Sequence, residues 1–137
     1  MLSRLEELER DGLVRNFGPV SSEVVRTSLY PAADAFVMPT LAEGFGFTNV
    51  EAMSYSLPVI SSRVGPIPEV VSHGETGALV SPGDVGQLEA AMDRLISEPE
   101  LACSMGAAAR KAFMSRFTVE QFRSRLGRVY ERALAAG

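Results

Sequence analysis

The stretch PTLAEGFGFTNVEAM, residues 39–53, follows the apolar run AFVM (35–38) and decides the fold of this 137-residue chain. An apolar run followed by glycines and then by a helical pattern is typical of a strand that turns into a helix in a parallel sheet. Two carboxylates, Glu43 and Glu51, stand eight positions apart around that turn. They are explained either by local folding chemistry or by a binding site.

Strand-like and helix-like segments alternate along the whole chain. Apolar or alternating runs predict strands at 13–17, 35–39, 57–62 and 77–81. Amphipathic or capped segments predict helices at 2–10, 23–33, 48–55, 66–72, 84–95, 99–116 and from 118 onward. We therefore predict an α/β fold, a Rossmann-like parallel sheet of about four strands with helices on both faces. Four strands are few for such a sheet, so we expect it to be truncated at its N-terminal side.

Composition narrows the class of protein. A hydrophobic content of 46% and a charged content of 22% are normal for one globular domain. The single cysteine, Cys103, excludes a disulfide within the chain and is compatible with a reducing compartment. The first residues lack a signal-peptide pattern, and no apolar run approaches the roughly 18 residues of a membrane span. We expect a cytoplasmic protein with at most peripheral contact at the inner membrane surface.

Charge is distributed unevenly along the chain. Residues 1–100 carry 6 basic and 15 acidic side chains, a net charge of −9, whereas residues 101–137 carry 7 basic and 2 acidic, a net charge of +5. Helical spacing places Arg125, Arg128 and Arg132 on one face. That face is either a solvated surface or a contact for a membrane or an acidic partner. Nucleic acid is not an expected partner, because the chain as a whole is acidic.

The stretch at residues 39–53 contains groups that could bind both an anion and the hydroxyls of a sugar. Ligands of open α/β sheets bind beyond the carboxyl ends of the strands, and the stretch lies at such an end. Gly44 and Gly46 let the backbone approach a ligand, and the following helix offers free N–H groups to a phosphate. The carboxylates of Glu43 and Glu51 can accept hydrogen bonds from sugar hydroxyls. A nucleotide sugar combines these groups.

Local chemistry offers a second explanation. Thr48-Asn49-Val50-Glu51 has the Thr-x-x-Glu pattern of a capping box, in which Glu51 would bind the backbone at the start of the helix. The glycines match neither the dinucleotide-binding fingerprint nor the P-loop. The spacing alone therefore leaves both explanations open.

A longer block of sequence resembles a known family. AADAFVMPTLAEGFGFTNVEAMSYSLPVISSRVGPIPEVVSHGETGALVSPGD, together with the tail from Met105, resembles the C-terminal domain of GT-B glycosyltransferases of the retaining GT4 type. The family hallmark is a glutamate, seven residues and a second glutamate, which here are Glu43 and Glu51. The likeness covers nearly the whole chain, 1–137, which would be a partial C-terminal, donor-binding domain.

The resemblance implies roles for individual residues. In the family the first glutamate lies by the donor sugar, which makes Glu43 the catalytic candidate. The second glutamate holds the nucleotide ribose, which assigns that role to Glu51. The backbone between them meets the sugar and the diphosphate. These donor-binding positions are Gly44, Phe45, Gly46, Phe47, Thr48 and Asn49.

The resemblance also implies a reaction and a partner. The expected substrate is a nucleotide-diphosphate sugar, transferred with retention and without a bound metal or other cofactor. We expect the acceptor-binding N-terminal domain to be missing, along with the cationic pair that contacts the diphosphate, and the isolated chain to be inactive. The acceptor half would act in cis or in trans, and the C-terminal helix would favour self-association. The alternatives are a standalone donor-half module that pairs with a separate chain, and a non-catalytic nucleotide binder.

One departure from the family pattern predicts local strain. Ser56 stands at the end of a helix where the family has glycine. That position favours the left-handed conformation, which costs a serine about 1 kcal/mol.

Overall fold

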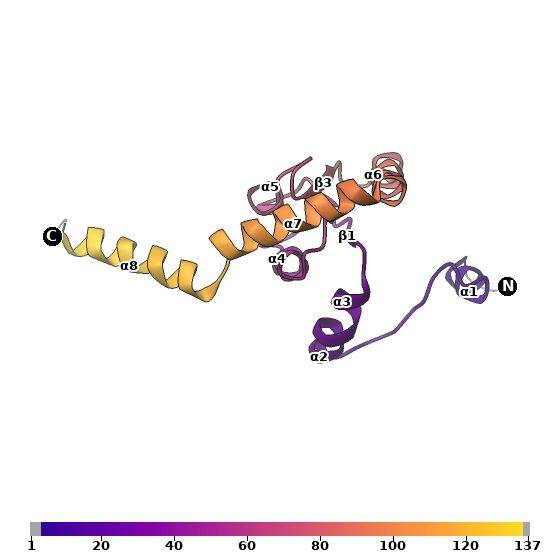
Figure 1. Ribbon diagram of the computed structural model, residues 1–137, viewed down its shortest axis with the longest axis horizontal. Helices are drawn as coiled ribbons and strands as arrows, with labels where there is room; N and C mark the ends of the chain where they lie inside the picture. Colours follow the sequence, from indigo (N-terminus) through magenta and orange to yellow (C-terminus); the bar gives the residue numbers. More distant parts are fainter. Residues whose placement is uncertain (1–3, 136–137) are drawn as a thin grey trace.

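The computed structural model describes residues 4–135 and shows three strands and a series of helices (Figure 1). The strands are β1 (Phe36–Met38), β2 (Val59–Ser62) and β3 (Gly77–Val80). The helical elements are α1 (Arg4–Arg10), α2 (Ser22–Val24), the π-helical turn η1 (Val25–Leu29), α3 (Tyr30–Ala32), α4 (Phe47–Ser54), α5 (Ile67–Val70), α6 (Val85–Ser97), α7 (Pro99–Arg116) and α8 (Val119–Ala135).

The three strands form one parallel sheet in the order β1-β2-β3. In the register of the sheet, Val37 lies beside Ile60 and Ile60 lies beside Ala78. All four residues of β2 are buried, which explains why VISS reads as a continuous run rather than as an alternating one. The predicted α/β class and parallel arrangement are therefore confirmed.

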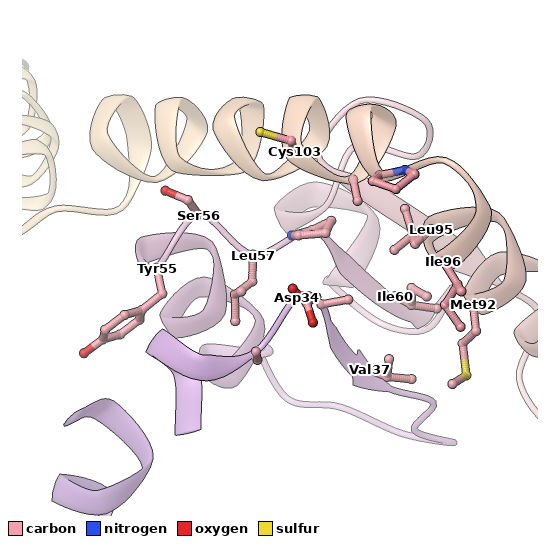
Figure 2. A pocket seen from close by; sticks show the side chains of 15 residues that line it. Asp34, Val37, Tyr55, Ser56, Leu57, Ile60, Met92, Leu95, Ile96 and Cys103 are labelled. Carbon is pink, nitrogen blue, oxygen red and sulfur yellow. The ribbon is translucent and has the colours of Figure 1, made fainter. Parts of the chain in front are cut away.

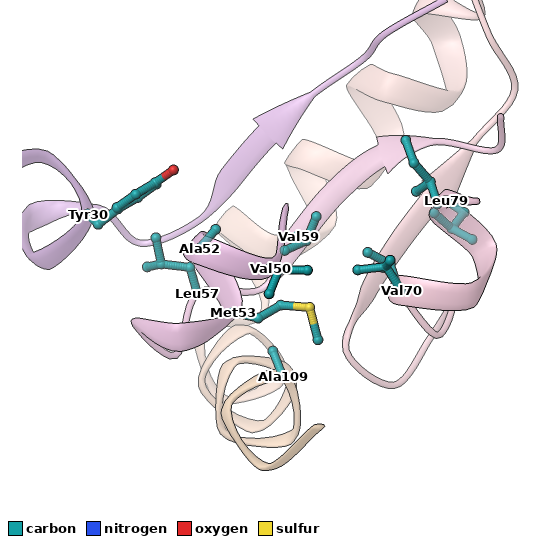
Figure 3. Packing of buried hydrophobic residues seen from close by; sticks show 11 residues of the cluster. Tyr30, Val50, Ala52, Met53, Leu57, Val59, Val70, Leu79 and Ala109 are labelled. Atoms are coloured by element: carbon teal, nitrogen blue, oxygen red, sulfur yellow. The ribbon is translucent and has the colours of Figure 1, made fainter. Parts of the chain in front are cut away.

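Helices cover both faces of the sheet. Successive residues of a strand point to opposite faces, so Val59 and Ile60 belong to different cores. Val59 packs with Met53 of α4, Val70 of α5 and Ala109 of α7 (Figure 3). The core of the other face contains Ile60, Val80, Leu95 and Met105, the last two from α6 and α7. Because α7 contributes to both cores, it links the two layers.

The prediction of a strand at residues 13–17 is wrong. This segment has no strand partner, and it runs as an exposed extended chain between α1 and α2 (Figure 1). The side chains of Leu13 and Phe17 are 74% and 48% exposed. A strand is stable only when neighbouring strands take up its backbone hydrogen bonds, and the described residues offer this segment no such neighbour. The sheet consequently has three strands rather than about four.

The predicted helices form with small shifts at their ends. The segment that begins at Ser22 is capped by Ser21, whose hydroxyl accepts a hydrogen bond from the Val24 amide at 3.3 Å. The helix expected at 66–72 is shorter and spans Ile67–Val70. Helix α1 ends at Arg10 as predicted, while Leu2, the first residue of its expected apolar face, lies outside the described residues.

Two glycines permit close contacts between these elements. A Cβ atom on Gly77 of β3 would lie 1.9 Å from the carbonyl oxygen of Val59. A Cβ atom on Gly106 of α7 would lie 2.1 Å from the carbonyl oxygen of Ser56. Ser56 itself has a φ of 61°, so the predicted left-handed conformation is confirmed. Helix α7 therefore packs directly on the strained turn between α4 and β2.

The outer edge of β1 carries no further strand within the described part of the chain. Beside this edge, on the α6 face of the sheet, lies a cavity of about 580 Å³ (Figure 2). Its walls are largely apolar and include Val37, Ile60, Met92 and Leu95, and Asp34 is the one acidic residue among the described residues that line it. Val37 of β1 is 37% exposed. The sheet is thus open on one side, as expected for a truncated sheet.

Candidate functional site

The loop between β1 and α4 lies at the carboxyl edge of the sheet, where α/β proteins bind ligands. It closes with Gly46, which is buried and has a φ of 85°. A Cβ atom there would lie 2.8 Å from Nδ2 of Asn49. Both the left-handed backbone and the missing space require glycine at this position. Gly46 therefore lets the chain turn directly from the loop into α4.

Glu43 is half-buried in this loop and faces the loop backbone. Its Oε1 atom accepts hydrogen bonds from the amides of Gly44, at 2.8 Å, and Phe45, at 3.4 Å. A Cβ atom on Gly65, in the loop after β2, would lie 2.8 Å from the Glu43 carbonyl oxygen. The loops that follow two neighbouring strands therefore pack against each other around Glu43.

The N-terminus of α4 points its first amides toward the same loop. The amides of Asn49 and Val50 donate to the carbonyl of Gly46, at 3.0 and 3.3 Å. The amides of Phe47 and Thr48 have no acceptor within residues 4–135. Unpaired amides at a helix start carry a partial positive charge, which suits an anionic group.

Glu51 lies on the exposed side of α4, one turn into the helix. Its carboxylate accepts a hydrogen bond of 3.4 Å from the hydroxyl of Tyr30 in α3. Burial raises the pKa of Tyr30 to about 12, and the nearby negative charge of Glu51 contributes to the same shift. Tyr30 therefore remains a neutral hydrogen-bond donor to Glu51 over the physiological pH range.

The capping box that the sequence allowed is absent. The residue preceding the helix is Gly46, not Thr48, and no side chain caps the helix start. The hydroxyl of Thr48 instead contacts Sδ of Met38 at 3.1 Å. Because the helix already begins at Phe47, Thr48 lies inside its first turn and does not have the extended backbone of a capping residue. Glu51 consequently carries no local capping task.

Asn49 is fully buried beneath the loop. Neither its Oδ1 nor its Nδ2 atom has a hydrogen-bond partner, although its relative exposure is 0%. An unpaired buried amide is destabilising by about 1–3 kcal/mol. The sequence placed Asn49 among the donor-binding residues, and the structure places its side chain below the loop rather than on its outer surface.

The side chains of Phe45 and Phe47 line a groove that sequence reasoning missed. Their rings lie 4.7 Å apart and tilt by 41°, and both are exposed. The groove has a volume of about 490 Å³ and reaches Arg116, Phe117 and residues of α8. The only feature of the sequence that could have indicated this groove was the excess of arginines after residue 100.

Arg116 is held firmly in this groove. Its guanidinium donates a hydrogen bond to the backbone carbonyl of Glu69 in α5. It also lies over the ring of Phe117, 4.8 Å from the ring centroid. A cation is therefore fixed near the aromatic pair of the loop.

The remaining polar residues have structural roles or do not form a cluster that could bind a ligand. Nδ1 of His73 accepts a hydrogen bond of 2.9 Å from the amide of Leu79, which fits a turn residue. Within residues 4–135, no group of three histidine, cysteine or acidic side chains could hold a metal ion. The site therefore consists of backbone amides, two carboxylates and an aromatic groove with arginines.

Comparisons with known proteins identify the family of this chain. The family model described as glycosyl transferases group 1 matches residues 4–112. The MMP α-(1→4)-mannosyltransferase of Mycolicibacterium hassiacum is 33% identical over 132 residues, covering 96% of this chain and 32% of that protein.

Two solved structures extend the comparison to three dimensions. Sucrose-phosphate synthase from Thermosynechococcus elongatus superposes with a TM-score of 0.80 at 31% identity, covering 96% of this chain and 34% of that one. Anabaena HepE in complex with UDP-glucose superposes with a TM-score of 0.78 at 25% identity, covering 93% of this chain and 35% of that one. The chain thus spans about a third of the length of its relatives. It belongs to the group 1 glycosyl transferases and corresponds to part of a GT-B, GT4-type C-terminal domain.

Proposed function

We propose that this chain is the donor-binding part of a retaining glycosyltransferase and that it binds a nucleotide-diphosphate sugar at the loop between β1 and α4. The observation that carries the proposal is the junction at Gly46, at the carboxyl edge of the sheet, where the first two amides of α4 are unpaired. Glu43 lies in the loop before this junction, and Glu51 lies one turn into the helix after it. One structural relative was solved with UDP-glucose, which supports this ligand class.

The diphosphate would lie at the start of α4. The free amides of Phe47 and Thr48 donate to it, and the helix dipole stabilises its negative charge. The same interactions stabilise the charge that develops on the diphosphate as the bond to the sugar breaks. In this proposal no metal ion or other cofactor is required.

The two glutamates would hold the hydroxyls at the ends of the ligand. Glu51 is exposed beside the helix start, and its bond to Tyr30 fixes one carboxylate oxygen while the other stays available to a ribose hydroxyl. Glu43 would bind the donor sugar. To do so it exchanges its present bonds to the amides of Gly44 and Phe45 for bonds to sugar hydroxyls, which also releases those amides to the ligand.

The acceptor would be bound by a second half of the enzyme. We propose that this half acts in the same protein or as a separate chain. We also propose that the isolated chain, 1–137, does not catalyse sugar transfer. The open edge of β1 and the adjoining apolar cavity support the proposal, because both present surface suited to further polypeptide (Figure 2). We also propose a cytoplasmic location, where nucleotide sugars are the donors.

Isothermal titration calorimetry tests the donor site. UDP, GDP, ADP and UDP-glucose are titrated into the wild-type chain, the Glu51→Ala variant and the Glu75→Ala variant. Glu75 is an exposed matched control, since it precedes β3 and lies at the opposite edge of the sheet. We expect one nucleotide to bind the wild type and the control equally, and the Glu51 variant at least about tenfold more weakly, as for loss of a charged hydrogen bond. Equal heats from all three proteins would refute the assignment of Glu51.

A further inference from the structure

The carboxylate of Glu51 is held by a residue that lies outside the motif around it. Its Oε2 atom accepts a hydrogen bond of 3.4 Å from the hydroxyl of Tyr30 in α3, 21 residues earlier in the chain. Within residues 4–135 the carboxylate has no other hydrogen bond and no ion pair. The direction of this carboxylate is therefore set by Tyr30, and its Oε1 atom is left for an external partner.

The ring of Tyr30 is fixed on two sides. It stacks on Tyr55 at the end of α4, with 5.1 Å between the centroids, and it meets Phe36 of β1 edge to face at 5.9 Å. Only 6% of Tyr30 is exposed, and it belongs to the same core as Ala52 of α4 (Figure 3). A ring in a close-packed interior has little freedom to rotate away. Its hydroxyl therefore occupies a fixed position beside Glu51.

The hydroxyl of Tyr30 is a permanent donor at neutral pH. Burial raises the pKa of Tyr30 to about 12, and the charge of Glu51 contributes to the same shift. The phenol therefore keeps its one proton, which it donates to the carboxylate.

Glu51 follows the unpaired amides of α4 by one turn. It lies four positions after Phe47, so the two residues share one side of the helix and lie about 6 Å apart along its axis. Side chains of a helix lean toward its N-terminus, which directs the carboxylate back toward the amides of Phe47 and Thr48. In a nucleotide the ribose is joined directly to the inner phosphate. A phosphate at these amides therefore brings the ribose hydroxyls toward Glu51.

We propose that Tyr30 is a positioning residue for the nucleotide and that it makes the site prefer ribonucleotides to 2′-deoxyribonucleotides. The inference rests on the proposed donor site. By holding one oxygen of Glu51, Tyr30 keeps the other turned toward the ribose 2′-hydroxyl, which donates to it. This reduces the side-chain freedom that Glu51 loses on binding and so raises the affinity. A 2′-deoxy nucleotide lacks the hydroxyl and gains nothing from the bond between Tyr30 and Glu51.

Packing of Tyr30 alone does not explain this choice of partner. A buried tyrosine hydroxyl needs an acceptor, and a backbone carbonyl would satisfy it equally well. Tyr30 pairs instead with an exposed, flexible carboxylate, which loses rotamer freedom that it would keep in water. A ligand at Glu51 gives that loss of freedom a purpose, because the carboxylate is then already oriented for binding.

Calorimetry with pairs of nucleotides tests the proposal on the full chain. UDP, GDP and ADP are each compared with the corresponding 2′-deoxy nucleotide. Tyr30→Phe keeps the ring and removes the hydroxyl. Tyr55→Phe is the matched control, because the Tyr55 hydroxyl forms no hydrogen bond among the described residues.

The expected result is a change in preference rather than a general loss of affinity. For the nucleotide that binds best, the wild type and the Tyr55 variant should prefer the ribose form by at least about tenfold, as for a hydrogen bond to a charged group. In Tyr30→Phe this preference should fall by about threefold or more, as for loss of one ordinary hydrogen bond, while the affinity for the 2′-deoxy form stays that of the wild type. Adding Tyr30→Phe to Glu51→Ala should change nothing further, because Tyr30 acts through Glu51.

The other outcomes separate this inference from the proposed function. If Glu51→Ala loses the preference and Tyr30→Phe keeps it, the donor site stands and the role of Tyr30 is refuted. Equal weakening of both nucleotide forms by Tyr30→Phe would reduce Tyr30 to a structural residue and also overturn the inference. If no nucleotide binds the wild type, the donor site itself fails and the inference falls with it. Thermal unfolding confirms that each variant is folded at the temperature of the titration.

Discussion

The hydroxyl of Tyr30 donates a hydrogen bond of 3.4 Å to the carboxylate of Glu51, 21 residues further along the chain. Tyr30 is buried, stacks on Tyr55 with 5.1 Å between the ring centroids and contacts Phe36 edge to face. This aromatic cluster joins the helical segment before β1 to the exposed side of α4. It therefore connects the proposed ribose-binding carboxylate to the core.

The first prediction concerns alkaline pH. Because burial raises the pKa of Tyr30 from 10.0 to about 12, the unfolded chain releases this proton at lower pH than the folded chain does. The free energy of unfolding should be constant below pH 10 with respect to this group and should fall as the pH rises from 10 to about 12. Urea unfolding across this range measures the fall.

Variants identify the group responsible. Glu51→Gln removes the negative charge but not the burial, so the pKa of Tyr30 should decrease while remaining above its ordinary value. Tyr30→Phe should remove this part of the pH dependence entirely. An unchanged alkaline profile in Tyr30→Phe would show that another group titrates.

The second prediction concerns the turn into α4. Gly46→Ala forces a side chain into a left-handed backbone and against Asn49, so we expect a loss of about 2 kcal/mol or more in the free energy of unfolding. Gly44→Ala is the matched control, because its φ is not positive and no atom lies within 4 Å of the added carbon. In chemical denaturation, the Gly46→Ala variant should have a clearly lower midpoint than the Gly44→Ala variant. Equal midpoints would contradict the described turn.

The third prediction is a stabilising change. Ser56 has a φ of 61°, so Ser56→Gly should relieve strain and raise the free energy of unfolding by up to about 1 kcal/mol. The same exchange at Ser115, within α7, should lower it by about 0.5–1 kcal/mol, because glycine is unfavourable inside a helix. Thermal unfolding followed by circular dichroism distinguishes the two. A destabilised Ser56→Gly variant would contradict the strain.

The fourth prediction concerns the buried Asn49. Leucine has nearly the same shape and no polar atoms, so Asn49→Leu should stabilise the ligand-free chain by about 1–3 kcal/mol. If the amide supports the loop once a nucleotide is bound, the same variant should also bind that nucleotide more weakly. Thermal unfolding and calorimetry on one preparation measure both effects. A stabilised variant with unchanged nucleotide binding would show that Asn49 only fills space, and a destabilised variant would contradict the unpaired amide.

Much of the fold could be predicted from local patterns. The helix at Pro99–Arg116 and the strands at Phe36–Met38, Val59–Ser62 and Gly77–Val80 follow from apolar runs, prolines and caps, which act over a few residues. The family also followed from one continuous block around Glu43 and Glu51. Residues 13–17 have a strand-like pattern too, but a pattern does not supply the neighbouring strand.

The sequence by itself determined the α/β class, the parallel direction of the strands and the position of the glycine turn, because propensity and periodicity are properties of short segments. Only the tertiary structure decided what the residues near that turn do. Glu51 binds Tyr30 rather than a helix amide, and the aromatic pair of the loop lines a groove together with Arg116. These contacts join segments far apart in the chain, and their geometry is set by how α3, α4 and α7 pack on the sheet.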